Sequence, residues 1–328
     1  MKKILFTLAA FAIIFASCTK DMVTPEPEAR LMRVTATVQE PADTRATLEE
    51  VGTGELKSIR FKWETSDVIQ MAFVQGAVKK TANATITSVS EDGRTATFTV
   101  FVPEGITGDF TLYAYRSSRF PSYTEGSELL ASNPTIAVLP KSPNNYNNQF
   151  GEQSHLVSLW DKKDVAYTGG DMPAVSLSFK HLGAMMTLKI KNIGSAATTY
   201  MYELGFKSTT NTHWVRNSSG NAMAQFDMAS GNYVTGQERL NDILSLKTGN
   251  FNAGEEKTRY VWFVPGAYTP GNPLQLIARN GTFSIIGSSG SNTKDAGNFV
   301  PGKNYVVYVT IAGTSPNYVL KYSNSSFE

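Results

Sequence analysis

The sequence has few of the residues from which many functional sites are built. It contains one cysteine and three histidines in 328 residues, so it can form neither a disulfide framework nor a cysteine-rich zinc site. Charged residues make up 18% of the chain and the formal net charge is +2, which excludes a charge-rich disordered chain. We expect a folded protein with no metal, no cofactor and no nucleic-acid partner. At roughly 150 residues per domain, the length predicts two domains.

Residue patterns typical of catalysis are also missing. His155, His181 and His213 are far apart in the sequence and belong to no HxH or HxxxH pair, so we interpret them as structural or surface residues. The glycine-rich stretches 52–54 and 287–290 are not followed by a predicted helix or by the lysine of a phosphate-binding loop, which favours hairpin tips. We expect the chain not to be an enzyme.

The N-terminal segment has the features of an export signal. Lys2 and Lys3 precede an apolar run from Ile4 to Ala16. A run of this length is too short for a permanent transmembrane helix, but it fits the apolar region of a secretory signal. We therefore expect residues 1–17 to be a signal peptide.

The end of this signal resembles a bacterial lipobox. Small residues precede Cys18 in the sequence FASC, where signal peptidase would cut and the thiol would receive a diacylglycerol. The alternative, an ordinary small core cysteine, is disfavoured because Cys18 stands where export cleavage belongs. Residues 18–30 are polar and contain two prolines, which predicts an extended, lipidated tether to the cell outer membrane.

Polar and apolar residues alternate through much of the remaining chain, in segments rich in Val, Ile, Thr, Phe and Tyr. This pattern, with Gly, Asn, Pro and Ser clusters between the segments, is typical of antiparallel β-sandwiches. In the first such segment Met32, Val34, Ala36 and Val38 share one face, which predicts a half-buried strand. Further strands are expected at 58–63, 68–74, 95–102, 110–116, 135–139, 175–179, 184–192, 200–207, 259–264, 274–279, 281–286 and 305–312.

The segment TGGDMP, residues 168–173, interrupts this alternation. We place the boundary between two domains near Pro173. The prediction is all-β, with one β-sandwich over residues 31–172 and a second over residues 173–328. The polar segment 237–246 is the one expected helical turn.

Aromatic side chains could form a platform for glycan. Most of them lie in alternating strands, so Trp63, Phe179 and Trp262 are assigned to the core. The candidates for an exposed surface that binds glycan or a host protein flank two arginines in an expected loop. They are Tyr115, Phe120 and Tyr123, around Arg116 and Arg119.

Four elements of the chain follow one another in an order and spacing that one family shares. They are TRAT (44–47) with WETSDVI (63–69), FTLYAY (110–115), VSLSFKHLGA (175–184), and WFVP (262–265) with PGKNY (301–305). Together they resemble the fimbrillin family, the subunits of lipoprotein-derived type V pili. Ser66 stands where the family usually has glycine, and the second element lacks the family's proline.

The resemblance implies two tandem transthyretin-like β-sandwiches, export as a surface lipoprotein, and assembly with other fimbrillin subunits into a homo- or heteropolymer. It also implies that an arginine-specific protease cuts at Arg45, in a polar segment after the first strand. Such a cut would release the lipid and the strand of Met32, Val34, Ala36 and Val38, and a strand from another subunit would fill the groove. The alternative is that Arg45 is an ordinary solvated arginine.

A donor strand should be terminal, mobile and alternating. Tyr318, Leu320 and Tyr322 share one face of the tail 316–328, which makes this tail the candidate donor. An equally supported alternative is that the tail forms the last edge strand of the second sandwich.

These observations predict a structural subunit or accessory component of a cell-surface fimbria that supports adhesion. The alternative function is a monomeric outer-membrane lipoprotein that binds glycan or a host ligand without polymerising. The two differ in whether Arg45 is cut and whether the cut chains join.

Overall fold

The computed structural model describes most of the chain after residue 29. The described residues are 30–39, 46–47, 50–51, 58–116, 128–140, 156–208, 214–215, 224–234, 236, 240–241, 243–265, 273–282, 284–288, 294–295, 299–323 and 327. Over these ranges the chain is all-β, with strands joined by turns and no α-helix, as the sequence predicts. The same ranges accordingly hold no helix that is long and apolar enough to span a membrane. The predicted signal peptide and nearly all of the tether lie outside them.

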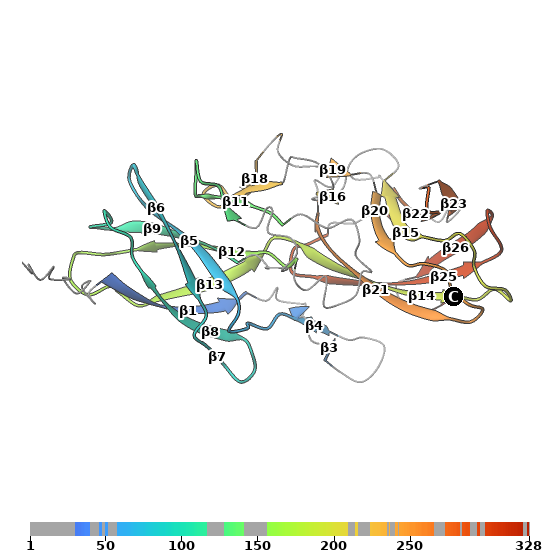
Figure 1. The fold of residues 1–328 in the computed structure, drawn as a ribbon, viewed down its shortest axis with the longest axis horizontal. Coiled ribbons are helices and arrows are strands. Elements are labelled where there is room, and N and C mark those ends of the chain that lie inside the picture. Colours follow the sequence, from blue (N-terminus) through green and yellow to red (C-terminus); the bar gives the residue numbers. More distant parts are fainter. Residues whose placement is uncertain are drawn as a thin grey trace, which may run out of the picture.

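The first sheet has eight strands, in the order β6, β5, β9, β12, β13, β1, β8 and β7 (Figure 1). The bounds are β1 Leu31–Val38, β5 Val68–Gln75, β6 Val78–Thr85, β7 Ser88–Val89, β8 Thr95–Phe101, β9 Phe110–Arg116, β12 Leu159–Val165 and β13 Val175–His181. The sheet is curled, since β6 contacts β8 across five intervening strands. Its inner side encloses an apolar core in which Phe73, Leu112 and Phe179 are fully buried.

The second sheet lies at the other end of an elongated molecule (Figure 1). Its order is β19, β16, β21, β14, β25, β26, β23, β22, β15 and β20, with β24 paired to β22. The bounds are β14 Ala184–Asn192, β15 Glu203–Ser208, β16 Trp214–Val215, β19 Leu240–Asn241, β20 Ile243–Lys247, β21 Glu256–Pro265, β22 Pro273–Arg279, β23 Ile285–Ser288, β24 Lys294–Asp295, β25 Asn304–Ala312 and β26 Tyr318–Ser323. This sheet is also curled, because β20 contacts β21, and it encloses a second core.

Two expectations about the second half are wrong. Residues 243–247, predicted within a helical turn, form β20, because β15 supplies an antiparallel partner along its whole length. β13, predicted to open the second sandwich, pairs with β1 and β12, and its Val175, Leu177 and Phe179 lie in the first core. The chain therefore passes from one sheet to the other at Leu182 and Gly183, after the expected boundary near Pro173.

The glycine-rich segment 168–173 explains the misplaced boundary. It is a loop between β12 and β13 of the same sheet, in which Gly169 and Gly170 adopt φ values of 93° and 88°. Glycines of this kind mark a sharp turn whether the turn lies within a sheet or between two. The composition of the loop could therefore not distinguish the two cases.

A small sheet joins the two halves of the chain. It consists of β10 Glu128–Leu129, β11 Ile136–Val138, β17 Gln225–Asp227 and β18 Asn232–Tyr233. Phe226 of β17 packs against Trp160 of β12, with ring centroids 4.9 Å apart. β17 and β18 follow β14, β15 and β16 of the second sheet in the sequence, yet they cover the outer face of the first sheet. A three-stranded sheet of β2 Ala46–Thr47, β3 Glu50–Val51 and β4 Ser58–Arg60 lies between β1 and β5 in the sequence.

Candidate functional site

The strand β1 is the candidate site, because it is the strand that the proposed processing would remove. It pairs with β8 in antiparallel fashion over seven residue pairs, from Leu31–Phe101 to Thr37–Thr95. On its other side it pairs with β13 in parallel over five, from Val34–Val175 to Val38–Phe179. β1 is therefore an inner strand of the first sheet, and its loss would unpair backbone groups on two neighbours.

The inner face of β1 is part of the first core. Met32, Val34 and Ala36 are buried, and Val38 packs partly buried against the same cluster, so the predicted alternation is confirmed. Full burial of a side chain the size of Met or Val stabilises the fold by about 1.5–3 kcal/mol, so Met32 and Val34 together contribute about 3–6 kcal/mol. The first core consequently depends on whichever strand occupies this position.

Both ends of β1 are fastened to the sheet. The Arg30 guanidinium donates hydrogen bonds to the carbonyls of Val102 and Pro103, the first at 3.2 Å. At the other end, the Gln39 N–H donates to the Phe179 carbonyl at 2.7 Å. Cys18 and Arg45, the predicted lipidation and cleavage residues, lie outside the described residues.

The candidate donor tail is an inner strand of the second sheet. β26 lies between β25, with which it forms five residue pairs, and β23, with which it forms two. Tyr318 and Leu320 are 3% and 2% exposed in the second core, and Tyr322 packs against Phe206 with ring centroids 6.0 Å apart. The tail is thus neither a free segment nor the edge strand that we expected as the alternative.

A buried ion pair lies at one rim of the first sheet. The Arg116 guanidinium donates to Asp67 Oδ1 at 2.7 Å and to the Val157 carbonyl at 2.7 Å. It also lies 4.7 Å from the centre of the Phe61 ring, which suits a cation over an aromatic face. The ring of His181 also packs against Phe61, with centroids 6.5 Å apart, and burial and the positive charge of Arg116 lower the pKa of His181 to about 4. His181 is therefore a neutral packing residue, as interpreted from the sequence.

The predicted aromatic platform is wrong for Tyr115. Its side chain is fully buried between the first sheet and the small bridging sheet, and its hydroxyl donates to the Val138 carbonyl at 3.2 Å. Phe120 and Tyr123 lie outside the described residues, as do His155 and His213. The core assignment is confirmed for Trp63 and Phe179, whose rings pack 5.3 Å apart, while Trp262 is only partly buried against three clusters.

An exposed aromatic residue was missed by the sequence analysis. Tyr200, predicted to begin a strand, lies in the loop before β15 and is 75% exposed. The run Gly-Ser-Ala-Ala-Thr-Thr that precedes it is the sequence signal that could have placed it in a loop, because small residues of this kind favour loops over strands.

Comparison with known proteins finds similar solved structures. No family model matches the chain, and no curated protein matches it. A proposed cell adhesion protein from Bacteroides ovatus is 15% identical with a TM-score of 0.47, over 89% of this chain and 95% of that chain. The fimbrial anchor protein Mfa2 from Porphyromonas gingivalis is 10% identical with a TM-score of 0.42, over 90% and 98%. A proposed polysaccharide-binding protein from Bacteroides thetaiotaomicron is 9% identical with a TM-score of 0.42, over 86% and 92%.

Proposed function

We propose that the chain is a structural subunit or accessory component of a cell-surface fimbria that supports adhesion. In this proposal it is exported as an outer-membrane lipoprotein on Cys18, cut at Arg45, and assembled by strand exchange. One observation carries the proposal: β1 is an inner strand of the first sheet, yet it is the first strand of the described chain. A single cut after β1 therefore separates it covalently from every other strand of its sheet.

The position of β1 is suited to replacement by another strand. Its neighbours β8 and β13 present Phe98, Val100 and Leu177 on the core side, opposite the positions of Val34, Met32 and Ala36. Without β1, these side chains and two rows of backbone groups would face water. An incoming strand with alternating apolar residues would satisfy both the core and the backbone.

The arginines of the first strand are poorly placed for proteolysis. The Arg30 guanidinium is bound by two carbonyls, and Arg33 lies within the paired part of β1. Arg45 directly precedes β2, in the connection that leaves the first sheet. A cut at Arg45 would leave β1 on the same fragment as the proposed lipid, so that one cut releases both from the rest of the chain. We therefore favour Arg45 as the processing residue.

We propose the tail 316–328 as the donor, and the structure indicates what its transfer would cost. β26 would leave its place between β25 and β23, and the second core would lose the side chains of Leu320 and Tyr318. Burial of Leu320 alone contributes about 1.5–3 kcal/mol to the stability of that core. The inner face of β1 contributes a similar amount to the first core. Transfer is therefore close to balanced, and it proceeds only where another chain offers an empty groove.

The test uses a full chain in which a site for a sequence-specific protease replaces residues 44–47. After cleavage, β1 is removed by gel filtration in mild denaturant, and thermal unfolding is followed with and without added peptides. The peptide 30–39 reproduces the missing strand and tests for the groove. The peptide 316–328 tests the proposed donor, and the same peptide with Leu320→Asp is its control.

We expect the cut chain to unfold at a lower temperature than the uncut chain, and both unmodified peptides to restore its stability. A peptide at a hundred times its dissociation constant restores about 2.7 kcal/mol. The Leu320→Asp peptide should fail, because a buried carboxylate would lack a partner. Rescue by peptide 30–39 alone would show that the tail is not the donor. A chain without β1 that unfolds like the intact protein would rule out strand exchange.

A second experiment examines the native cell-surface form by mass spectrometry. We expect its sequence to begin at Ala46, and Cys18→Ala to remain in the periplasm. A native form that retains residues 18–45 would contradict the proteolytic step. Cut chains that stay monomeric would favour the alternative function, a monomeric surface lipoprotein that binds glycan.

A further inference from the structure

Four loops come together at the end of the molecule that lies furthest from the start of β1 (Figure 1). β14 and β25 are parallel and both end there, at Asn192 and Ala312. β15 begins there, where Glu203 faces Arg279 at the end of β22. Within the loops that connect these strands, residues 193–202, 248–255, 280–282 and 313–317 are what we call the far-end loops.

The far-end loops carry little charge. Glu255, which is paired with Lys257, is the one charged residue in the four ranges, although charged residues make up 18% of the chain. Most of their residues are Ser, Thr, Asn, Gly and Ala. Depletion of charge is typical of the centre of a binding surface, and Tyr, Ser, Gly and Asn are the residues that recognition loops use most. An ordinary solvated surface would carry more charge than this.

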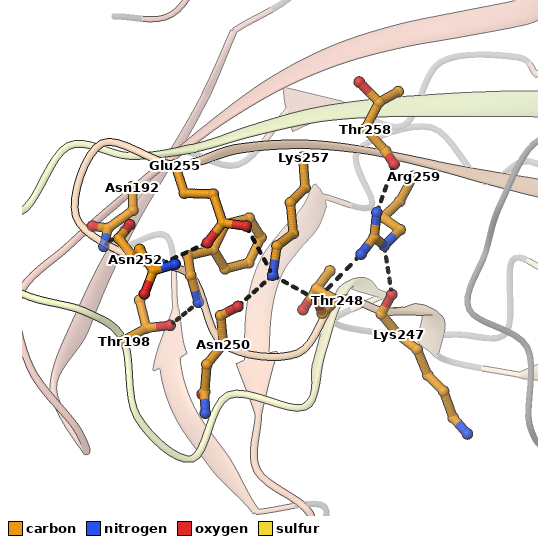
Figure 2. Close-up of polar contacts among 11 residues, drawn as sticks. Asn192, Thr198, Lys247, Thr248, Asn250, Asn252, Glu255, Lys257, Thr258 and Arg259 are labelled. Carbon is orange, nitrogen blue, oxygen red and sulfur yellow. Dashed lines mark hydrogen bonds and ion pairs between the residues drawn. The ribbon is translucent and has the colours of Figure 1, made fainter.

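Two cations of β21 are directed at these loops. Arg259 donates to the carbonyls of Lys247 and Thr248 at 3.1 and 3.4 Å (Figure 2). The ammonium group of Lys257 donates to the Thr248 carbonyl at 3.5 Å and lies 3.6 Å from Glu255 Oε1. These contacts hold the loop 248–255 against β21. The cations therefore brace the far-end loops without projecting from them.

Tyr200 projects from the far-end loops. It is 75% exposed, and its φ of 59° makes it the one non-glycine residue with positive φ in the part of the chain that the structure describes. A bulky residue in this left-handed region is strained, and such strain is concentrated at functional sites. An exposed tyrosine that served solubility or packing alone would have no reason to be held there.

Both neighbours of Tyr200 are fixed by other side chains. The Thr199 N–H donates to the Tyr318 hydroxyl, which in turn donates to the Thr199 carbonyl at 3.1 Å. On the other side, the Met201 N–H donates to Asn250 Oδ1 at 2.9 Å. The conformation of Tyr200 is therefore imposed by its surroundings.

The same bracing extends along the loop 193–202. The buried Asn192 donates through Nδ2 to the carbonyls of Ala196 and Asn252, at 2.9 and 3.0 Å. The Thr198 N–H donates to the Phe251 carbonyl at 2.7 Å, and the Phe251 N–H donates to Thr198 Oγ1 at 2.7 Å (Figure 2). Two of the far-end loops are thus locked together, and Tyr200 is presented on a preorganised surface.

The chemistry of this surface fits a neutral glycan. A tyrosine ring offers an apolar face for the C–H groups of a sugar, and exposed Thr199, Asn252 and Asn317 offer neutral donors and acceptors for its hydroxyls. Ile193 and Val319, 53% and 55% exposed, add apolar area at the same end. A protein interface would instead be expected to use arginine and several exposed aromatic residues. The four ranges contain no arginine, and of their aromatic residues Phe251 is buried, Tyr202 is half-buried and Tyr200 is exposed.

We propose that the far-end loops form a binding surface for neutral glycan, with Tyr200 as the stacking residue. The inference rests on the proposed function in one respect: the proposed tether at the N-terminal end would hold the far-end loops away from the membrane. It is independent of strand exchange, so it can be tested with the uncut chain. Its failure would leave the peptide experiment on the groove unaffected.

The test is affinity electrophoresis of the uncut chain in native gels that contain mannan, dextran, galactan or xylan, with alginate as the charged polysaccharide. The decisive variant is Tyr200→Asn, because asparagine tolerates positive φ and keeps the loop folded. Phe101→Asn is the matched control, since Phe101 is an aromatic residue 51% exposed at the opposite end of the molecule, paired with Leu31.

We expect at least one neutral polysaccharide to retard the chain, with a dissociation constant that Tyr200→Asn raises tenfold or more and Phe101→Asn leaves unchanged. The melting temperature of Tyr200→Asn should not fall. The proposal is overturned if no neutral polysaccharide binds, if only alginate binds, or if Tyr200→Asn binds like the original chain. Binding to immobilised fibronectin that depends on Tyr200, without binding to polysaccharide, would identify a protein partner instead.

Discussion

Acidification is expected to destabilise the protein through His181. Burial beside Phe61 and the charge of Arg116 lower its pKa to about 4, whereas a histidine in an unfolded chain titrates near pH 6.5. Between these values the unfolded chain takes up a proton that the folded chain does not. The free energy of unfolding is therefore unaffected by this group above about pH 6.5 and falls by about 1.4 kcal/mol per pH unit below it, down to about pH 4.

The measurement is urea unfolding of the full chain at pH 7 and pH 5, compared with His181→Gln. From pH 6.5 to pH 5 the wild-type chain should lose about 2 kcal/mol more than the variant. Burial raises the pKa of Asp161, which also affects stability in acid, but this group is present in both chains and cancels in the comparison. Equal losses in the two chains would refute the reasoning about His181.

Two further substitutions test the packing at the ends of the first sheet. Asp67→Asn leaves the buried guanidinium of Arg116 without its carboxylate and should lower the free energy of unfolding in urea by about 3–5 kcal/mol. Adding Arg116→Met should restore a large part of this loss, because it removes the unpaired charge. A double variant no more stable than Asp67→Asn would contradict this reasoning. Gly183→Ala places a Cβ atom 2.5 Å from the Phe263 carbonyl at the junction of the sheets and should cost about 1–3 kcal/mol by the same assay. Its control is Gly281→Ala, where the added Cβ meets nothing within 4 Å, so equal effects of the two would argue against a clash at the junction.

Local alternation determined the strands and their inner faces. β1, β5, β8, β9, β14 and β25 lie close to the predicted ranges, and Met32, Val34 and Ala36 point into the core as expected. This succeeds because successive side chains of a strand point to opposite faces, so burial of one face imposes a period of two on the sequence itself. The all-β class follows from the same pattern.

Tertiary structure decided which strands became neighbours. Val34 pairs with Val175, and nothing in either local sequence indicates that β13 belongs to the first sheet. The burial of Tyr115 depends likewise on the strand of Phe226, from the other half of the chain. Alternation indicates that one face of a strand is buried, but it does not indicate which segment covers that face. Turn residues likewise indicate that the chain reverses, but not which strand the next segment pairs with. Pairing between distant segments, and the left-handed conformation imposed on Tyr200 by its neighbours, therefore emerge only when the whole chain is folded.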